Sequence, residues 1–271
     1  MSNGRSRFFY RCCSDTSAGD LRCGRCQTCP DNHTHPALSN EELLCEFKKH
    51  QILKSSKPTA LISVTDRPLE ALKRALGKLH DGGEGADTIF IITIRIPGGE
   101  ERQGGTRPIH AQEIARKSHD CENSHVFKHE YLFQWEIPEH YVLHCVSLST
   151  LLNRGIKEAL GLDLHKGLRF PSFSEMQDAL VDKVIGFRVP RVIGRRLGDL
   201  AWAIYGEKCT YDLAFRVMVD CFGRYEIDGH GQYVNLNGFN DHEYFEFSDI
   251  CVIEKRIQKR IRSHLKKGFV R

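Results

Sequence analysis

The sequence predicts an α+β fold in its N-terminal part, followed by a mainly helical C-terminal region that contains a β-hairpin. Two bulky apolar runs, residues 7–13 and 87–96, are typical of strands. Leucines at 69, 72, 76 and 79 recur every three or four residues, which is typical of one buried helix face. After about residue 152 helical patterns dominate, so we expect one domain over 1–152 and a second region over 153–271.

The first elements follow from local signals. The run `RFFYRCC`, residues 7–13, predicts a strand, and residues 14–37 form a loop rich in Gly, Pro, Asn and Cys. Ser39 and Glu42 have capping-box spacing, because the hydroxyl and the carboxylate can each bond an unpaired amide at a helix start. A helix should therefore begin at Ser39.

The middle of the N-terminal domain continues this alternation. Residues 60–64 predict a short buried strand, and Thr65 or Asp66 can cap the leucine-rich helix, which stops before `HDGGEG`. A Gly-rich loop, residues 97–105, and a helix near 110–117 come after the strand at 87–96. Glu130 then opens an apolar run that resumes at 141–145 after Ile-Pro.

The C-terminal region predicts helices joined to one hairpin. Ser172 and Glu175 offer a second capping box before a helix through Val184. Helices are expected at 197–205 and 211–222, a hairpin at 224–236 with its turn at Asp228-Gly229, and a last helix at 252–268. Three helices followed by a hairpin would also fit a winged-helix module.

Charge is spread unevenly along the chain. The net charge of +4 is mild for 31.0 kDa and does not by itself indicate a nucleic-acid binder. Residues 165–271 include 18 basic and 14 acidic residues, so this part of the chain holds the whole excess of basic over acidic residues. The last helix is rich in Lys and Arg, which would suit nucleic acid or anionic lipid, although a solvated basic face is the alternative.

The cysteines and the lack of a long apolar run bear on location. No segment approaches the roughly 20 apolar residues of a membrane span, and the first residues lack a secretory core. Eleven scattered cysteines, an odd number, favour reduced thiols. We expect an intracellular protein, cytoplasmic or nuclear, without a membrane span.

Four motifs in order carry a resemblance. They are `FYRCCSD` around Arg11, His50 before the next strand, `LISVTDRPLEALKRAL` with Ser63, and `EYLFQWEIP` with Glu130. In this order they resemble the catalytic A chains of the cholera and heat-labile enterotoxin group of ADP-ribosyltransferases, and more closely an uncharacterised enterotoxin-like domain common in fungal proteins. The resemblance covers about residues 7–150 and implies that family's split β-sheet core with flanking helices.

The resemblance implies NAD as substrate and a role for each matched residue. It implies NAD glycohydrolase or mono-ADP-ribosyltransferase activity toward an unknown protein acceptor, with Glu130 and Ser63 as the catalytic pair. Arg11, His50 and Thr65 would contact the nucleotide. Cleaving the nicotinamide bond leaves positive charge on the ribose, which an ionised carboxylate stabilises in the transition state. An arginine fork suits the pyrophosphate.

The sequence departs from the enterotoxin pattern at two positions. Lys128 stands where those enzymes carry the first glutamate of Glu-x-Glu, and the Ser-Thr-Ser strand reads Ser63-Val64-Thr65. A charged lysine cannot act as a base. Three hypotheses therefore remain: NAD hydrolysis, transfer to an acceptor other than arginine, and nucleotide binding without catalysis. In the third, the chain is an interaction protein that uses its basic C-terminal region to bind nucleic acid or a partner.

Each residue also has a structural interpretation. Glu130 could be a solvated strand-end carboxylate. Arg11 could form a salt bridge, Ser63 could bond backbone, and His50 could be an ordinary surface or core histidine.

A second constellation predicts a metal site in the Cys-rich loop. Cys23, Cys26, Cys29 and His33 in `CGRCQTCPDNHTHP` are soft ligands near enough in sequence to share one zinc ion, with His35 close by. A cysteine-rich loop without metal is the alternative. An iron-sulfur cluster lacks a fourth cysteine at the usual spacing.

Overall fold

The fold is given by a computed structural model of the chain. It divides into two compact units, residues 1–67 with 88–145 and residues 68–87 with 146–271, and each is described by itself. The described residues are 6–17, 19–23, 35–51, 59–98, 107–118, 123–161, 171–185, 189–221, 225–227, 233–235 and 247–268.

The first unit is built on a six-stranded sheet with the order β4-β5-β2-β1-β3-β6. Its strands are β1 (Arg7–Ser14), β2 (Leu61–Thr65), β3 (Ile89–Ile96), β4 (Ile109–His110), β5 (Glu130–Gln134) and β6 (Val142–Ser147). The helices of this unit are α2 (Asn40–Gln51), α4 (Ala111–Lys117) and the short η2 (Ser124–Phe127) and η3 (Glu139–Tyr141). The α+β class predicted for the N-terminal part is confirmed.

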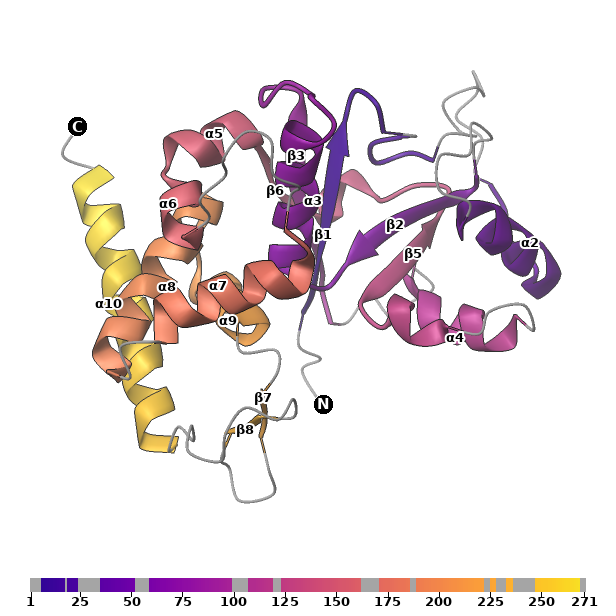
Figure 1. Cartoon of the computed structure of the whole chain (residues 1–271). Helices are drawn as coiled ribbons and strands as arrows, with labels where there is room; N and C mark the ends of the chain where they lie inside the picture. Colours follow the sequence, from indigo (N-terminus) through magenta and orange to yellow (C-terminus); the bar gives the residue numbers. More distant parts are fainter. Residues whose placement is uncertain are drawn as a thin grey trace. The chain divides into compact units, whose positions relative to one another are not determined.

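The sheet has a narrow joint between β1 and β2. β1 and β3 pair antiparallel over eight residues, and β2 and β5 over five. Over the described residues, β1 and β2 share the single pair Tyr10 and Thr65. Figure 1 shows β2 and β5 running obliquely to β1. The two halves of the sheet therefore diverge from this one pair.

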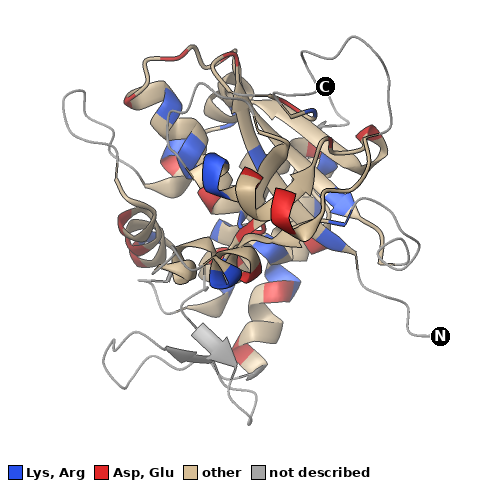
Figure 2. Ribbon diagram, turned by 90° about the vertical axis from the view of Figure 1, so that its right-hand side faces the viewer, with Lys and Arg blue, Asp and Glu red and all other residues tan. Residues whose placement is uncertain are grey.

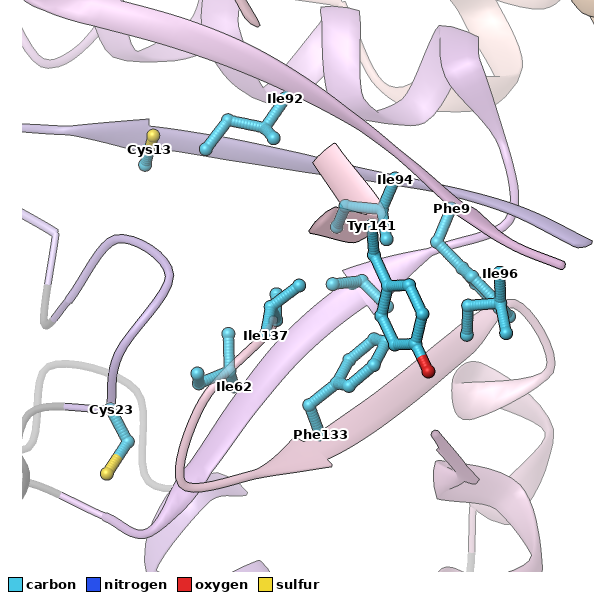
Figure 3. Close-up of a cluster of buried hydrophobic side chains, with 11 residues drawn as sticks. Phe9, Cys13, Cys23, Ile62, Ile92, Ile94, Ile96, Phe133, Ile137 and Tyr141 are labelled. Atoms are coloured by element: carbon cyan, nitrogen blue, oxygen red, sulfur yellow. The ribbon is translucent and has the colours of Figure 1, made fainter. Parts of the chain in front are cut away.

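Two apolar clusters cover opposite faces of the sheet. Because side chains alternate along a strand, Ile62 and Phe133 enter one cluster while Leu61 and Leu132 enter the other. Figure 3 shows the first cluster, where isoleucines from β3 meet Phe9, Phe133 and Tyr141. The second is completed by α2 and α4, which supply Phe47, Ala111, Ile114 and Ala115.

The second unit is mainly helical, as the sequence predicts. Its elements are α3 (Pro68–His80), α5 (Leu148–Asn153), α6 (Ile156–Leu160), α7 (Phe173–Ile185), α8 (Pro190–Tyr205), η4 (Gly206–Lys208), α9 (Tyr211–Cys221), α10 (Phe247–Gly268) and the hairpin β7 (Tyr225–Ile227) and β8 (Tyr233–Asn235). The predicted turn at Asp228-Gly229 lies outside the described residues.

Close contacts hold the helices of this unit together. The buried Asp220 of α9 accepts the amide of Leu69 through Oδ2 at 2.8 Å, which caps the start of α3. α8 packs on α10 at Gly194 and Gly198. A Cβ at Gly194 would lie 2.5 Å from the carbonyl oxygen of Ile253, so only glycine permits this approach.

Local expectations agree with the structure where one signal decides the element. Both capping boxes form: the Ser39 amide donates to Glu42 at 2.9 Å and the Ser172 amide to Glu175 at 2.7 Å. α8 begins at Pro190 rather than near 197, because proline fits the first turn of a helix. The short helices α5 and α6 were not predicted from the sequence. The leucine-rich helix α3 contacts α7 and α9 and lies in the second unit. No described helix is long and apolar enough to cross a membrane.

Candidate functional site

Ser63 and Glu130 lie on the same face of the sheet. Thr65 is directly opposite Glu130, and Ser63 is opposite Leu132, so alternation places all four side chains with the cluster that α2 and α4 cover. Their strands β2 and β5 are neighbours, and β1 with Arg11 is next in the sheet. The strands that carry Arg11, Ser63 and Glu130 are therefore neighbours in the sheet, as the resemblance implies.

The Ser63 hydroxyl holds the Glu130 carboxylate. Ser63 Oγ donates a hydrogen bond to Glu130 Oε1. The Glu130 side chain is only 19 % exposed, which contradicts the interpretation of a fully solvated strand-end carboxylate. Among the described residues no partner is found for Glu130 Oε2, so this oxygen remains available to a ligand hydroxyl.

Arg11 reaches this site through the backbone of Ser63. The register with β3 pairs Arg11 with Ile92, which places its Cβ on the face opposite to Glu130. Its guanidinium nevertheless donates through Nη1 to the Ser63 carbonyl at 2.7 Å and through Nη2 to Gly19 at 2.5 Å. Ser63 therefore bonds Glu130 with its side chain and Arg11 with its main chain, at the joint where the sheet divides.

His50 comes from the last turn of α2. Its Nε2 lies 3.9 Å from Glu130 Oε1, and its Nδ1 lies 3.1 Å from Thr59 Oγ1. The imidazole is 24 % exposed, so it is neither a core nor a free surface side chain. α2 is tied to the start of β2 by Glu46, whose Oε2 accepts the Ala60 amide at 2.8 Å. This tether places His50 beside the carboxylate.

Thr65 is adjacent to Glu130 but largely enclosed. Its side chain is 2 % exposed, and Oγ1 accepts the amide of Arg67 at 3.2 Å. The hydroxyl thus supports the turn after β2, which is one of the two capping roles that the sequence predicts for residues 65 and 66. A direct contact with a nucleotide would require this side chain to become exposed.

Sequence reasoning missed an imidazole-carboxylate pair next to Glu130. His129 Nδ1 lies 2.9 Å from Asp66 Oδ1, and the Asp66 amide donates to the His129 carbonyl at 3.2 Å. The following cross-strand position, Thr65 opposite Glu130, continues this ladder. Only the register between β2 and β5 brings residues 66 and 129 together, so no signal local to either strand predicts the pair.

Lys128 occupies the position two residues before Glu130, and its side chain is exposed. Its carbonyl contacts His110 Nε2 at 2.8 Å, which fixes the turn that leads into β5. The imidazole of His110 stacks on Tyr131 at 4.7 Å, and the guanidinium of Arg7 lies 5.0 Å from the same ring. Burial raises the pKa of Tyr131, Asp66 raises it further, and Arg7 opposes the shift.

The predicted metal ligands are only partly described. Cys23 is 2 % exposed and packs in the apolar cluster with Ile62 and Ile137, while Cys26, Cys29 and His33 lie outside the described residues. Within the described ranges no group of three or more His, Cys, Asp or Glu could hold a metal ion. His35 stacks on Trp135 with ring centroids 4.4 Å apart, so this pair is an aromatic contact.

The fold and the site define an α+β domain with an oriented carboxylate beside a sheet joint, and comparison with known proteins assigns that domain to a family. Residues 4–151 match the family described as "Domain of unknown function (DUF7587)". This match spans more than half of the chain, and the chain belongs to the DUF7587 family. Comparison with curated proteins and with solved structures gave no match.

Proposed function

We propose that the first unit binds NAD and cleaves its nicotinamide bond. The observation that carries this proposal is the hydrogen bond from Ser63 to Glu130, with Arg11 bonded to the carbonyl of the same serine. An oriented carboxylate with one oxygen available is the group that a developing ribose cation requires. We propose NAD as the substrate because the ordered motifs resemble those of the enterotoxin A chains and because the sheet divides into two halves.

In this proposal Glu130 is the catalytic residue and Ser63 positions it. Glu130 Oε2 would accept the ribose 2'-hydroxyl, and the negative charge would stabilise the oxocarbenium-like transition state as nicotinamide leaves. Ser63 holds Oε1, so the carboxylate need not reorganise during the reaction. Arg11 places a positive charge near the site, which favours the pyrophosphate.

The acceptor in this proposal is water or a nucleophile that needs no glutamate base. Lys128 is exposed two residues before Glu130, and a charged ammonium cannot remove a proton from an arginine acceptor. NAD glycohydrolase activity needs only that water reach the oxocarbenium ion, so it is the form of the activity that the residues favour. Mono-ADP-ribosyl transfer to a protein remains a second form.

The test compares turnover and affinity for NAD in matched variants. Glu130→Gln keeps the size of the side chain but removes its charge, so nicotinamide release should fall about 100-fold or more while NAD affinity changes little. Glu139→Gln, at an exposed carboxylate of the same unit, is the control and should leave both values unchanged. Equal turnover of the two variants would refute the role of Glu130.

A second candidate function is that of a catalytically degenerate interaction protein. The exposed Lys128 in place of a glutamate favours it, because one catalytic carboxylate of the enterotoxin pair is missing. This candidate predicts that wild-type turnover is undetectable and that Glu130→Gln changes only affinity. The same pair of measurements therefore separates the two functions.

We also keep zinc and a reducing compartment as proposals. Cys23, with the neighbouring Cys26, Cys29 and His33, supplies soft ligands, and elemental analysis of protein purified without chelator tests the metal. Less than a tenth of an equivalent of zinc would end that proposal. Free thiols at Cys13, Cys45 and Cys209 support an intracellular location of the protein, cytoplasmic or nuclear.

A further inference from the structure

The last helix, α10, separates its apolar and its basic side chains. Ile250, Ile253, Ile257 and Ile261 are buried, and α10 packs on α8 along this side. Figure 2 shows basic and acidic positions interspersed over the described helices and strands. The exposed side of α10 differs from this general pattern.

From residue 249 to residue 266, every exposed side chain of α10 is a lysine or an arginine. They are Lys255, Lys259, Arg262 and Lys266. At about 100° per residue these four positions fall within an arc of about 60°, and at about 1.5 Å per residue they span about 16 Å. We call these four residues the basic stripe.

Arg256, Arg260 and His264 of α10 lie instead at the contact with α8. Arg260 donates through Nε to Asp199 of α8 at 2.5 Å, and His264 Nε2 lies 2.7 Å from the same carboxylate oxygen. The Cβ of Arg256 would lie 2.6 Å from a Cβ at Gly194, so this residue stands at the helix contact. These three half-buried residues therefore face α8, whereas the residues of the basic stripe face solvent.

We propose that the basic stripe binds the phosphate backbone of a nucleic acid duplex without reading its sequence. The cations follow one another at about one per helical turn along a line, which suits a linear array of phosphates. An amphipathic helix that binds membranes inserts exposed apolar side chains, whereas the isoleucines of α10 are buried against α8. Protein interfaces are depleted in lysine and enriched in aromatic residues, and the stripe has the opposite composition. This function is independent of NAD cleavage in the first unit.

The number of charges sets the expected salt dependence. Four phosphate contacts on duplex DNA predict a slope of about −3.6 for log K against log salt. Affinity should therefore fall about 150-fold between 50 and 200 mM salt. Each single substitution in the stripe should make the slope less steep by about 0.9.

The experiment measures binding of the full chain to 20-base-pair DNA and RNA duplexes as a function of salt. One variant replaces Lys255, Lys259, Arg262 and Lys266 with glutamine. The control variant replaces four exposed cations that lie elsewhere, Arg95, Arg116, Lys117 and Lys208, and so makes the same change in net charge. Single variants such as Lys259→Gln provide the same readout should the fourfold variant fail to fold.

The proposal expects the stripe variant to lose about 3 units or more of slope on either duplex, and the control variant to lose less than 1. An equal loss in both variants would overturn it, because general charge rather than the stripe would then explain binding. Tighter binding to anionic vesicles or to polyglutamate at the same charge concentration would overturn it in favour of a lipid or protein partner. Absence of duplex binding at 50 mM salt would also overturn it.

Discussion

Replacing Glu46 with alanine should destabilise the first unit by about 1.5 to 3.5 kcal/mol. The carboxylate is 4 % exposed and accepts the amide of Ala60, which is 0 % exposed, at 2.8 Å. Leaving that buried amide without its charged acceptor costs about 1.5–3 kcal/mol. The ion pair with Lys49, whose side chain is 45 % exposed, adds no more than about 0.5 kcal/mol.

Urea unfolding followed by circular dichroism measures this change. Glu41→Ala is the matched control, since Glu41 is an exposed glutamate of the same helix, and it should change stability by less than about 0.5 kcal/mol. Glu46→Gln keeps an acceptor for the Ala60 amide and should fall between the two. If Glu46→Ala were as stable as Glu41→Ala, the bond between α2 and the start of β2 would contribute nothing to stability and would not be what holds His50 beside Glu130.

Three further predictions concern other parts of the chain. On the proposed function, Lys128→Glu should raise ADP-ribosyl transfer to arginine acceptors above the wild-type rate; wild-type protein that modifies arginine as fast would show that Lys128 does not occupy the acceptor position. Burial raises the pKa of the Cys13 thiol to about 12, so an alkylating reagent at pH 8 should label the exposed Cys45 and leave Cys13 unmodified, as read by mass spectrometry. Between pH 9 and 12 stability should fall, because the unfolded Cys13 thiol ionises first. Gly198→Leu should cost about 2 kcal/mol or more on thermal unfolding, because even a Cβ would lie 2.8 Å from the Cβ of Arg260; unchanged stability would contradict the packing of α8 on α10.

Elements governed by short-range signals could be predicted from the sequence. Ser39 with Glu42 and Ser172 with Glu175 form the capping boxes that their spacing indicates. The strand predicted at 87–96 is present as Ile89–Ile96. α8 was predicted too short, because Gly194 and the arginines of its first turns weaken the apolar pattern although Pro190 starts the helix.

The site could be predicted only where the resemblance supplied long-range order. Ser63 and Glu130 are 67 residues apart, and ordered motifs rather than periodicity paired them. Arg11 donates to the main-chain carbonyls of Ser63 and Gly19, and no side-chain motif specifies such partners. The pair of Asp66 and His129 depends on strand register, which is decided by the packing of both faces of the sheet.

The central claim is that the carboxylate held by Ser63 cleaves NAD. Its most direct test is to incubate the purified full chain with NAD and to quantify free nicotinamide by chromatography, with Glu130→Gln protein in parallel. The proposed function predicts nicotinamide release by the wild-type protein and a loss of about 100-fold or more in the variant. Nicotinamide release that stays at the level of NAD in buffer alone would contradict it.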